Sequence, residues 1–525
     1  MTPKQEPRTL NAEPRTLNQE PRTLNGILIP LISGIALSFA FPRANLHWIA
    51  WFALAPMMYY IYRLPWKGAL LSGLAFGLGY FGSLLYWILI FGKLPWAALV
   101  TYEALHIVIF AVLAKAIGGR LGLWGRFALL PALWIAIEWF RALGTFGFTW
   151  GDLGYSQFKV LPLIQIAAVT GVWGVSLILA MSNAALANLA LARKLKTGSS
   201  TAFGQVFLVM LIVLGVTIFG LAVERQPLQG KEITAAVIQG NINQDVVQDF
   251  AYRENVWDTY TSLTLDAASR GANLIVWPES VIPGCPGRDP ADQFKLHAIA
   301  RHTAAALLVG GHDEDEEGNW FNCALLVTPK DGLRGKTSKV HLVPFGEYIP
   351  ARKYMPSLKG YRAAMFDVSP ALGRHLLDTG SYKVGAAICF ESIFPYIARE
   401  LTRDGAEVLC IITNDVWFLR SPAAEQHMSK SVFRAIENHR YLLRAASTGV
   451  SAIIDPNGRI LDSQDIFRRK VIVETIRFQT ELTFYTRHGD WLIYLSLVLA
   501  ALLAIRSRIT YHASRLTHHS SRSTP

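Results

Sequence analysis

The chain carries eight long apolar segments, and this pattern constrains its fold more than any other feature. A helix needs about 20 mainly apolar residues to cross the hydrocarbon core of a bilayer. Of the 525 residues, 52% are hydrophobic and 17% are charged, which excludes an ordinary soluble protein. Seven segments precede a large polar block and the eighth follows it: 26–41, 46–62, 68–92, 97–118, 127–143, 164–192, 205–223 and 491–505. We therefore predict a bundle of eight transmembrane helices.

The positive charges between these segments predict the orientation of the chain. Cytoplasmic loops of membrane proteins are enriched in Lys and Arg. Eight spans place both termini on one side, where the loops and tails hold sixteen Lys and Arg. The opposite short loops hold four: Arg43, Lys93, Arg141 and Lys159. We therefore expect both termini in the cytoplasm and the polar block on the other side of the membrane.

Charge and cysteine content narrow the classes of partner and cofactor. The formal net charge is +12, but Lys and Arg punctuate the apolar segments instead of forming a basic face with interleaved aromatic residues. This pattern favours anionic lipid headgroups over a nucleic acid as the partner. The four cysteines lack CxxC spacing and a nearby His cluster, so we expect neither a metal site nor a disulfide framework. A pairing of Cys285 with Cys323 stays open.

The sequence divides into five parts. Residues 1–25 hold three copies of the unit Glu-Pro-Arg-Thr-Leu-Asn, and a proline at every seventh residue excludes a coiled coil. We predict a disordered cytoplasmic tail there. The other parts are seven transmembrane helices, a polar domain, the eighth helix and a basic cytoplasmic tail, at 26–226, 227–485, 486–507 and 508–525.

The polar domain has the pattern of a layered α/β fold. Short β-rich runs such as 233–239 and 383–389 alternate with helical stretches such as 425–445. In such folds functional groups gather just past the carboxyl ends of strands. Functional side chains are therefore expected at those positions.

Three residues with complementary chemistry follow predicted strands. Glu279 lies in Val-Trp-Pro-Glu-Ser, Lys339 begins Lys-Val-His-Leu-Val-Pro-Phe-Gly-Glu-Tyr, and Cys389 lies in Ala-Ile-Cys-Phe-Glu-Ser. A thiol attacks an acyl carbon as its thiolate, so it needs a base and a nearby positive charge. The ammonium can also stabilise the oxyanion of a tetrahedral intermediate. Each residue alone has an ordinary structural interpretation, but together they predict an acyl-transferring site.

The Glu-Lys-Cys series is similar to that of the nitrilase superfamily. With Leu-Val-Pro-Phe-Gly-Glu-Tyr and eight apolar segments, the chain resembles the apolipoprotein N-acyltransferase family within it. The resemblance covers nearly the whole chain beyond residue 25. It extends to Gln239-Gly240-Asn241, Asn414-Asp415-Val416-Trp417-Phe418, Glu437-Asn438-His439-Arg440, Glu138-Trp139-Phe140-Arg141 and residues 150–157. It implies that the polar domain is an αββα sandwich.

The resemblance also implies a reaction. Cys389 would take an acyl chain from a membrane phospholipid as a thioester. The acyl group would then pass to the α-amine of the N-terminal S-diacylglyceryl cysteine of an apolipoprotein. Glu279 would be the general base, and Lys339 would stabilise the oxyanion. The enzyme would be a monomer without cofactor or metal in the bacterial inner membrane, with its catalytic domain in the periplasm.

The resemblance assigns supporting roles as well. Glu347 and Glu391 would orient the triad, and Trp417 would belong to a loop near the lipid entrance. Phe390 stands where many members have Tyr, so a hydroxyl near the site is missing.

Two residues of the predicted membrane helices have a second interpretation. Glu138 and Arg141 lie three residues apart, so on a helix they can form an ion pair, or they can bind the phospholipid headgroup.

Two other functions stay open from the sequence. One is a membrane-anchored amidase or nitrilase that uses water as the second substrate. The other is a non-catalytic lipid- or lipoprotein-binding scaffold with a degenerate outer domain.

Overall fold

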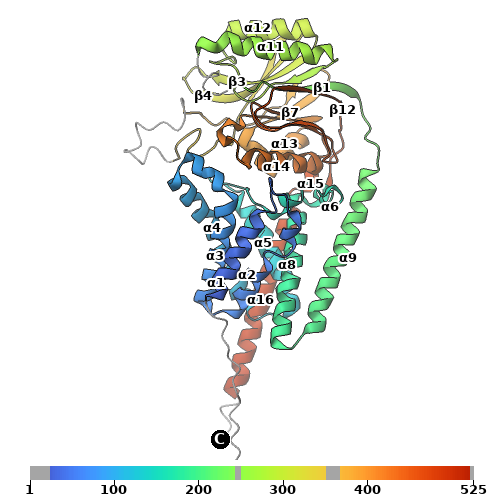
Figure 1. Cartoon of the computed structure of the whole chain (residues 1–525). Coiled ribbons are helices and arrows are strands. Elements are labelled where there is room, and N and C mark those ends of the chain that lie inside the picture. The colour runs from blue at the N-terminus through green and yellow to red at the C-terminus, as the bar shows by residue number, and fades with distance from the viewer. Residues whose placement is uncertain (1–23, 243–249, 351–366, 521–525) are drawn as a thin grey trace, which may run out of the picture.

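The computed structural model describes residues 24–242, 250–350 and 367–520, which form a helical bundle joined to a domain of stacked sheets (Figure 1). Almost all of the repeat-containing tail predicted at 1–25 lies outside these residues, as do the last five residues of the basic tail.

Long helices build the bundle. They are α1 (Asn25–Ser38), α2 (Ala55–Arg63), α3 (Trp66–Leu84), α4 (Lys93–Gly118), α5 (Leu123–Arg141), α8 (Val172–Leu195), α9 (Ser199–Glu224) and α16 (Trp491–Ser520). Short helices connect them: η1 (His47–Trp51), η2 (Tyr86–Phe91), η3 (Leu153–Gln157), α6 (Leu161–Ile164) and α7 (Ala167–Thr170). In the described part of the chain, five helices are long and apolar enough to cross a membrane: α4, α5, α8, α9 and α16. The chain is therefore a membrane protein, while the count of eight spans stays a prediction.

Three predicted spans are not continuous helices, and one of them, 68–92, is divided between α3 and η2. The segment 46–62 is divided between η1 and the nine-residue α2, which begins with a proline in its first turn. In the segment 164–192, the long helix starts only at Val172. The preceding Gly171 has φ +66°, a left-handed conformation that glycine adopts without steric cost and that interrupts the helix. Hydropathy detects none of these breaks, because the residues on both sides are apolar.

The polar domain consists of two six-stranded sheets stacked face to face. The first has the order β12-β1-β2-β3-β4-β5 and the second β11-β10-β9-β8-β7-β6. The strands of the first sheet are β1 (Glu232–Gln239), β2 (Leu274–Val276), β3 (Ala306–Glu314), β4 (Trp320–Thr328), β5 (Gly332–Ser338) and β12 (Lys470–Arg477). Those of the second are β6 (Leu377–Asp378), β7 (Lys383–Ile388), β8 (Val408–Thr413), β9 (Leu442–Ala446), β10 (Ser451–Ile454) and β11 (Ile460–Gln464).

Helices cover both outer faces of the stacked sheets. The helices α11 (Arg253–Ser269) and α12 (Pro290–Thr303) cover the first sheet, and α13 (Pro395–Arg403) and α14 (Ala423–Asn438) lie between the second sheet and the bundle (Figure 1). The remaining short helices are η4 (Phe250–Tyr252), η7 (Cys389–Ile393), η8 (Asp415–Phe418) and α15 (Phe484–His488). This order of layers is the expected αββα sandwich.

The parallel pairing of the central strands explains why the two sheets bury an apolar core between them. The strands β1, β2 and β3 are parallel, as are β7, β8 and β9, so alternate side chains of both sheets face inward. Val237, Leu308, Ile388 and Ile412 belong to this central cluster. The carboxyl ends of β2 and β7 carry Glu279 and Cys389.

The bundle and the sandwich share one continuous apolar core. It includes Trp173 of α8 together with Ile397 of α13 and Phe433 of α14. Buried hydrogen bonds cross the same boundary: the Thr149 hydroxyl donates to the Ile393 carbonyl (2.8 Å), and the indole N–H of Trp150 donates to Oε1 of Gln426 (2.7 Å). Both residues from the bundle thus contact the layer directly beneath the second sheet.

Candidate active site

Glu279 is held by three hydrogen-bond donors from three different segments. It follows β2, and its carboxylate is 5% exposed. Oε1 accepts from Nδ2 of Asn322 (2.7 Å) and Nζ of Lys339 (3.4 Å), and Oε2 accepts from the backbone N–H of Asn414 (2.7 Å). These contacts fix one carboxylate orientation, as a general base requires.

Lys339 lies between two carboxylates. It follows β5 and is almost completely buried, with Nζ 2.8 Å from Oε1 of Glu347 and 3.4 Å from Oε1 of Glu279. Burial alone would lower the pKa of Lys339, but the charges of Glu347 and Glu279 raise it above its usual range. The ammonium is therefore a permanent positive charge that stabilises an anion beside it.

Cys389 follows β7 in a strained turn. Its φ is +53°, which a residue with a Cβ adopts only at an energetic cost, and such strain concentrates at functional sites. Burial and the charge of Glu279 raise the pKa of the Cys389 thiol, whereas the charge of Lys339 lowers it. The resting group is the neutral thiol, so attack requires proton transfer to a base.

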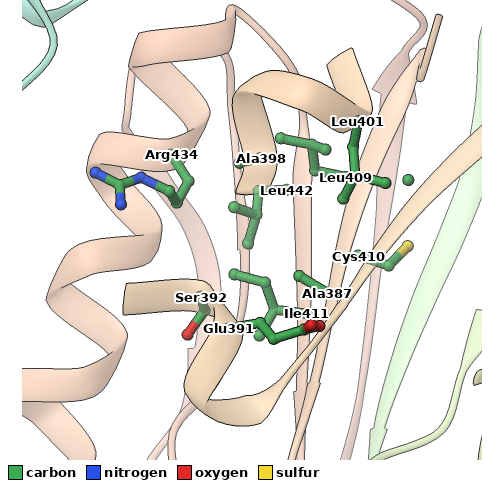
Figure 2. A pocket seen from close by; sticks show the side chains of 11 residues that line it. Ala387, Glu391, Ser392, Ala398, Leu401, Leu409, Cys410, Ile411, Arg434 and Leu442 are labelled. Atoms are coloured by element: carbon green, nitrogen blue, oxygen red, sulfur yellow. The ribbon is translucent and has the colours of Figure 1, made fainter. Parts of the chain in front are cut away.

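Glu391 ties the lysine segment to the nucleophile strand. Its Oε1 accepts from the backbone N–H groups of Val340 (2.8 Å) and His341 (3.2 Å), and its Oε2 accepts from that of Ile388 (2.9 Å). Figure 2 shows the Glu391 carboxylate and the Ser392 hydroxyl pointing to opposite sides of η7. Glu391 therefore joins the backbone that follows Lys339 to the backbone that precedes Cys389.

The cavity drawn in Figure 2 is not a substrate site. It lies between the second sheet and α13, is lined by Glu391, Ser392, Cys410 and Arg434 among others, and has a volume of about 10 Å³. That volume is close to the minimum for a single water molecule. An acyl chain does not fit there.

Sequence reasoning missed a buried network behind the nucleophile. His427 of α14 has Nδ1 3.0 Å from Oδ1 of Asp415, and Nε2 2.8 Å from the Ser392 hydroxyl and 3.3 Å from the Cys389 carbonyl oxygen. Arg444 pairs with Oδ2 of Asp415 (2.9 Å). Although burial raises the pKa of Asp415, Arg444 and His427 together lower it to about 2. The network joins an ionised carboxylate to the backbone of Cys389.

A buried asparagine of the first sheet contacts two carboxylates of the site and was also missed. Nδ2 of Asn322, on β4, lies 2.7 Å from Glu279 and 3.2 Å from Glu347. Asn322 thus bridges the two carboxylates that pair with Lys339. No motif marks this residue, because its function depends on strand pairing between β3, β4 and β5.

Comparison with known proteins identifies the family. Residues 33–185 match the model of the apolipoprotein N-acyltransferase N-terminal domain, and residues 234–481 match that of carbon-nitrogen hydrolases. The chain is 35% identical over 503 residues to the apolipoprotein N-acyltransferase of Geobacter metallireducens, covering 92% of this chain and 96% of that one. The chain belongs to the apolipoprotein N-acyltransferase family.

Other relatives agree with this assignment. The apolipoprotein N-acyltransferase of Nitrosomonas europaea is 31% identical, covering 89% of this chain and 93% of its own length. Among solved structures, an amidase of the nitrilase superfamily from Nesterenkonia AN1 matches with a TM-score of 0.39 and 16% identity. That match covers 51% of this chain and 98% of the amidase. In this apolipoprotein N-acyltransferase family member, the carbon-nitrogen hydrolase domain occupies the C-terminal part, at residues 234–481.

Aromatic side chains connect the site of this family member to the bundle. The Phe390 ring stacks on Phe148 at 6.4 Å, and Phe345 stacks on Phe146 at the same distance. Trp417, at the surface, is 51% exposed. Phe390 and Phe345 follow Cys389 and Lys339 closely in sequence. The chain therefore places apolar rings between the turn that carries Cys389 and the membrane helices.

The predicted ion pair between Glu138 and Arg141 is wrong. Arg141 instead pairs with Glu103 (2.5 Å) and Asp152 (3.0 Å). Oε1 of Glu138 accepts from the indole N–H of Trp134 (2.8 Å) and the backbone N–H of Leu153 (2.7 Å). Spacing along α5 permitted the pair, but neighbouring segments present stronger partners. Both side chains are buried inside the bundle.

All four cysteines are free thiols, so Cys285 and Cys323 do not pair. In the described ranges, no group of His, Cys, Asp and Glu side chains is arranged to hold a metal ion.

Proposed function

We propose that this protein transfers an acyl chain from a membrane phospholipid, through a thioester on Cys389, to the α-amino group of the N-terminal S-diacylglyceryl cysteine of apolipoproteins. The observation that carries the proposal is the convergence of Glu279, Lys339 and Cys389 at one edge of a sandwich whose other layers join a membrane bundle. A soluble amidase has no need of such a bundle, whereas an enzyme that cleaves a phospholipid ester must hold its site at the leaflet.

The first half-reaction forms the acyl-enzyme. Glu279 takes the thiol proton, and the sulfur of Cys389 attacks the ester carbonyl carbon. The charge of Lys339 stabilises the oxyanion of the tetrahedral intermediate. The carbon–oxygen bond then breaks, and the lysophospholipid alkoxide leaves with the proton held by Glu279.

The second half-reaction regenerates the thiol. The α-amine of the lipoprotein attacks the thioester carbon, and Glu279 removes a proton from the amine. The carbon–sulfur bond breaks, and the thiolate of Cys389 is reprotonated. An amide product and free enzyme remain, so atoms and charges balance over the cycle.

In this proposal, further residues position the triad, contact the acyl chain or stabilise the membrane part. Glu347 holds the Lys339 ammonium, and Glu391 holds the backbone on both sides of the triad. Phe390 and the exposed Trp417 contribute apolar surface where the acyl chain would approach. Glu138 and Arg141 maintain the membrane part that carries Thr149 and Trp150. The enzyme would act as a monomer in the inner membrane of a bacterium, with cytoplasmic termini and a periplasmic catalytic domain.

The test is the intact mass of the purified protein after incubation with phospholipid, comparing wild type with Cys389→Ser under conditions that preserve thioesters. We expect a gain of one acyl chain on wild type alone, discharged by a lipopeptide with a free N-terminal amine. Absence of both the adduct and the transfer, from folded protein and with every phospholipid supplied, would sink the proposal. Discharge by water with no transfer to the amine would instead indicate an amidase or thioesterase.

A further inference from the structure

The end of the bundle opposite the catalytic domain is strongly basic. There, α4 turns into α5, α8 turns into α9, and α16 runs out of the bundle (Figure 1). No Asp or Glu occurs in residues 104–137, 153–223 or 491–510. The cations of these turns and of α16 up to residue 510 are Lys115, Arg120, Arg126, Arg193, Lys194, Lys196, Arg506 and Arg508. An anion is therefore attracted to this end without competition from carboxylates of the same segments.

A cavity of about 510 Å³ lies within this basic end. The turn between α4 and α5 contributes Arg120 and Gly122, the start of α5 contributes Trp124, the start of α9 contributes Thr201, and α16 contributes Leu503 and Arg506. The volume falls in the range of sites that hold small molecules. Two arginines thus line one cavity, Arg120 from the turn between α4 and α5 and Arg506 from α16.

The residues around the cavity separate into a polar and an apolar group. Arg120 and Arg506 supply planar donors that match phosphate oxygens, and the Thr201 hydroxyl adds a further donor. Trp124 and Leu503 supply apolar surface, and Trp124 is half exposed, as is common for indoles at membrane interfaces. A ligand that satisfies both groups combines a phosphate with a hydrocarbon part.

We propose that this cavity binds the headgroup of an anionic phospholipid. The phosphodiester lies between Arg120 and Arg506, and the glycerol and first acyl carbons lie against Trp124 and Leu503. This lipid is not the acyl donor, because the cavity lies where α4 turns into α5, whereas Cys389 lies between β7 and α13, in the domain at the other end of the bundle (Figure 1). The site is independent of the acyl-transfer reaction, so its failure would leave the proposed function untouched.

Native mass spectrometry of the full-length protein, released from nanodiscs of phosphatidylcholine with increasing phosphatidylglycerol, measures the bound lipid. We expect one retained phosphatidylglycerol on wild type. The double variant Arg120→Gln/Arg506→Gln should weaken its binding at least tenfold. A matched control, Lys67→Gln/Arg508→Gln, removes the same charge from exposed residues outside the cavity and should keep the lipid.

A second variant fills the cavity without removing a charge. A Cβ added at Gly122 meets no atom within 4 Å, and the φ of −68° accepts any L-residue. Gly122→Phe should therefore fold normally and displace the lipid while both arginines remain. If this variant retains the lipid, or if the control double variant loses it equally, diffuse electrostatic attraction explains binding and the site does not exist.

Inorganic phosphate is the other ligand that could bind between the two arginines. Inorganic phosphate at 10-fold excess over the lipid, compared with chloride at equal ionic strength, should leave the retained phosphatidylglycerol in place, because phosphate lacks the apolar contacts with Trp124 and Leu503. Displacement by inorganic phosphate would overturn the assignment to a lipid.

Discussion

His427 lies with Nδ1 3.0 Å from Oδ1 of Asp415, while its opposite ring nitrogen faces the turn that carries Cys389. Both residues are completely buried. Burial and the charge of Arg444 lower the pKa of His427 to about 4, so the ring is neutral at physiological pH. Trp150 of the bundle lies against the same imidazole, with ring centroids 5.7 Å apart. The backbone of the nucleophile is thus supported from the membrane side.

Replacement of His427 by Leu should slow thioester formation about tenfold or more. The change removes the His427 contacts with the Ser392 hydroxyl and with Oδ1 of Asp415, and a hydrogen bond to a charged group contributes about 1.5–3 kcal/mol. Single-turnover acylation, followed by intact mass, measures the effect. His302→Leu, on the exposed side of α12, is the matched control and should acylate at the wild-type rate. Unchanged acylation by His427→Leu would show that the network does not position Cys389.

Glu279→Gln should make the Cys389 thiol ionise at lower pH and yet transfer acyl groups more slowly. Glutamine keeps the shape of the side chain but removes the charge that raises the pKa of Cys389. Alkylation by iodoacetamide should therefore reach half its maximal rate at a lower pH than in wild type. Acyl transfer should fall about 10²- to 10⁴-fold, because the general base is lost.

Lys339→Met should shift the pH midpoint of Cys389 alkylation in the opposite direction from Glu279→Gln. The charge of Lys339 lowers the pKa of Cys389, so its removal should move the alkylation midpoint to higher pH. Midpoints that move in the same direction in Glu279→Gln and Lys339→Met would contradict the electrostatic description of the site.

Asn322→Asp should make the rate of acylation increase as the pH is lowered. The new carboxylate would lie within hydrogen-bonding distance of Glu279 and Glu347, where the amide now donates to both. Three adjacent carboxylates around one ammonium raise one another's pKa values. We expect weak acylation at pH 8 that recovers as the pH is lowered and one carboxyl becomes protonated. Asn322→Leu, which lacks a titrating group, should be impaired without this recovery.

The triad could be predicted because each member lies in a short motif directly after a strand. Glu279, Lys339 and Cys389 each needed only local sequence and the knowledge that strand ends meet. His427 lies on α14 with no such signal, and its contact with Ser392 spans 35 residues. That contact follows from the packing of α14 on the second sheet, which no sequence pattern specifies.

The membrane part was predictable in composition but not in detail. Apolar length marked α4, α5, α9 and α16 correctly. Spacing on one helix suggested the wrong partner for Arg141, because Glu103 and Asp152 approach from segments 38 and 11 residues away. Buried charges select partners by three-dimensional proximity, and the hydropathy of a segment contains no information about its neighbours.

Lys430 should make the stability of the protein depend on pH in the alkaline range. Its side chain is buried in α14, with Nζ 4.3 Å from the centre of the Trp150 ring. Burial lowers the pKa of Lys430 from 10.5 to about 7. Between these two values the unfolded chain binds more protons than the folded one, so the free energy of unfolding rises with pH.

Thermal unfolding in detergent from pH 7 to pH 9.5 measures this dependence. We expect the midpoint temperature of wild type to rise with pH by more than that of Lys430→Met, since methionine keeps the apolar stem and removes the titrating group. Lys93→Met, at an exposed position, should keep the wild-type slope because its ammonium is solvated in both states. Parallel curves for wild type and Lys430→Met would mean that Lys430 has the same affinity for a proton in the folded and unfolded chains. The contact between α14 and Trp150 would then have to accommodate a fully charged ammonium at pH 9.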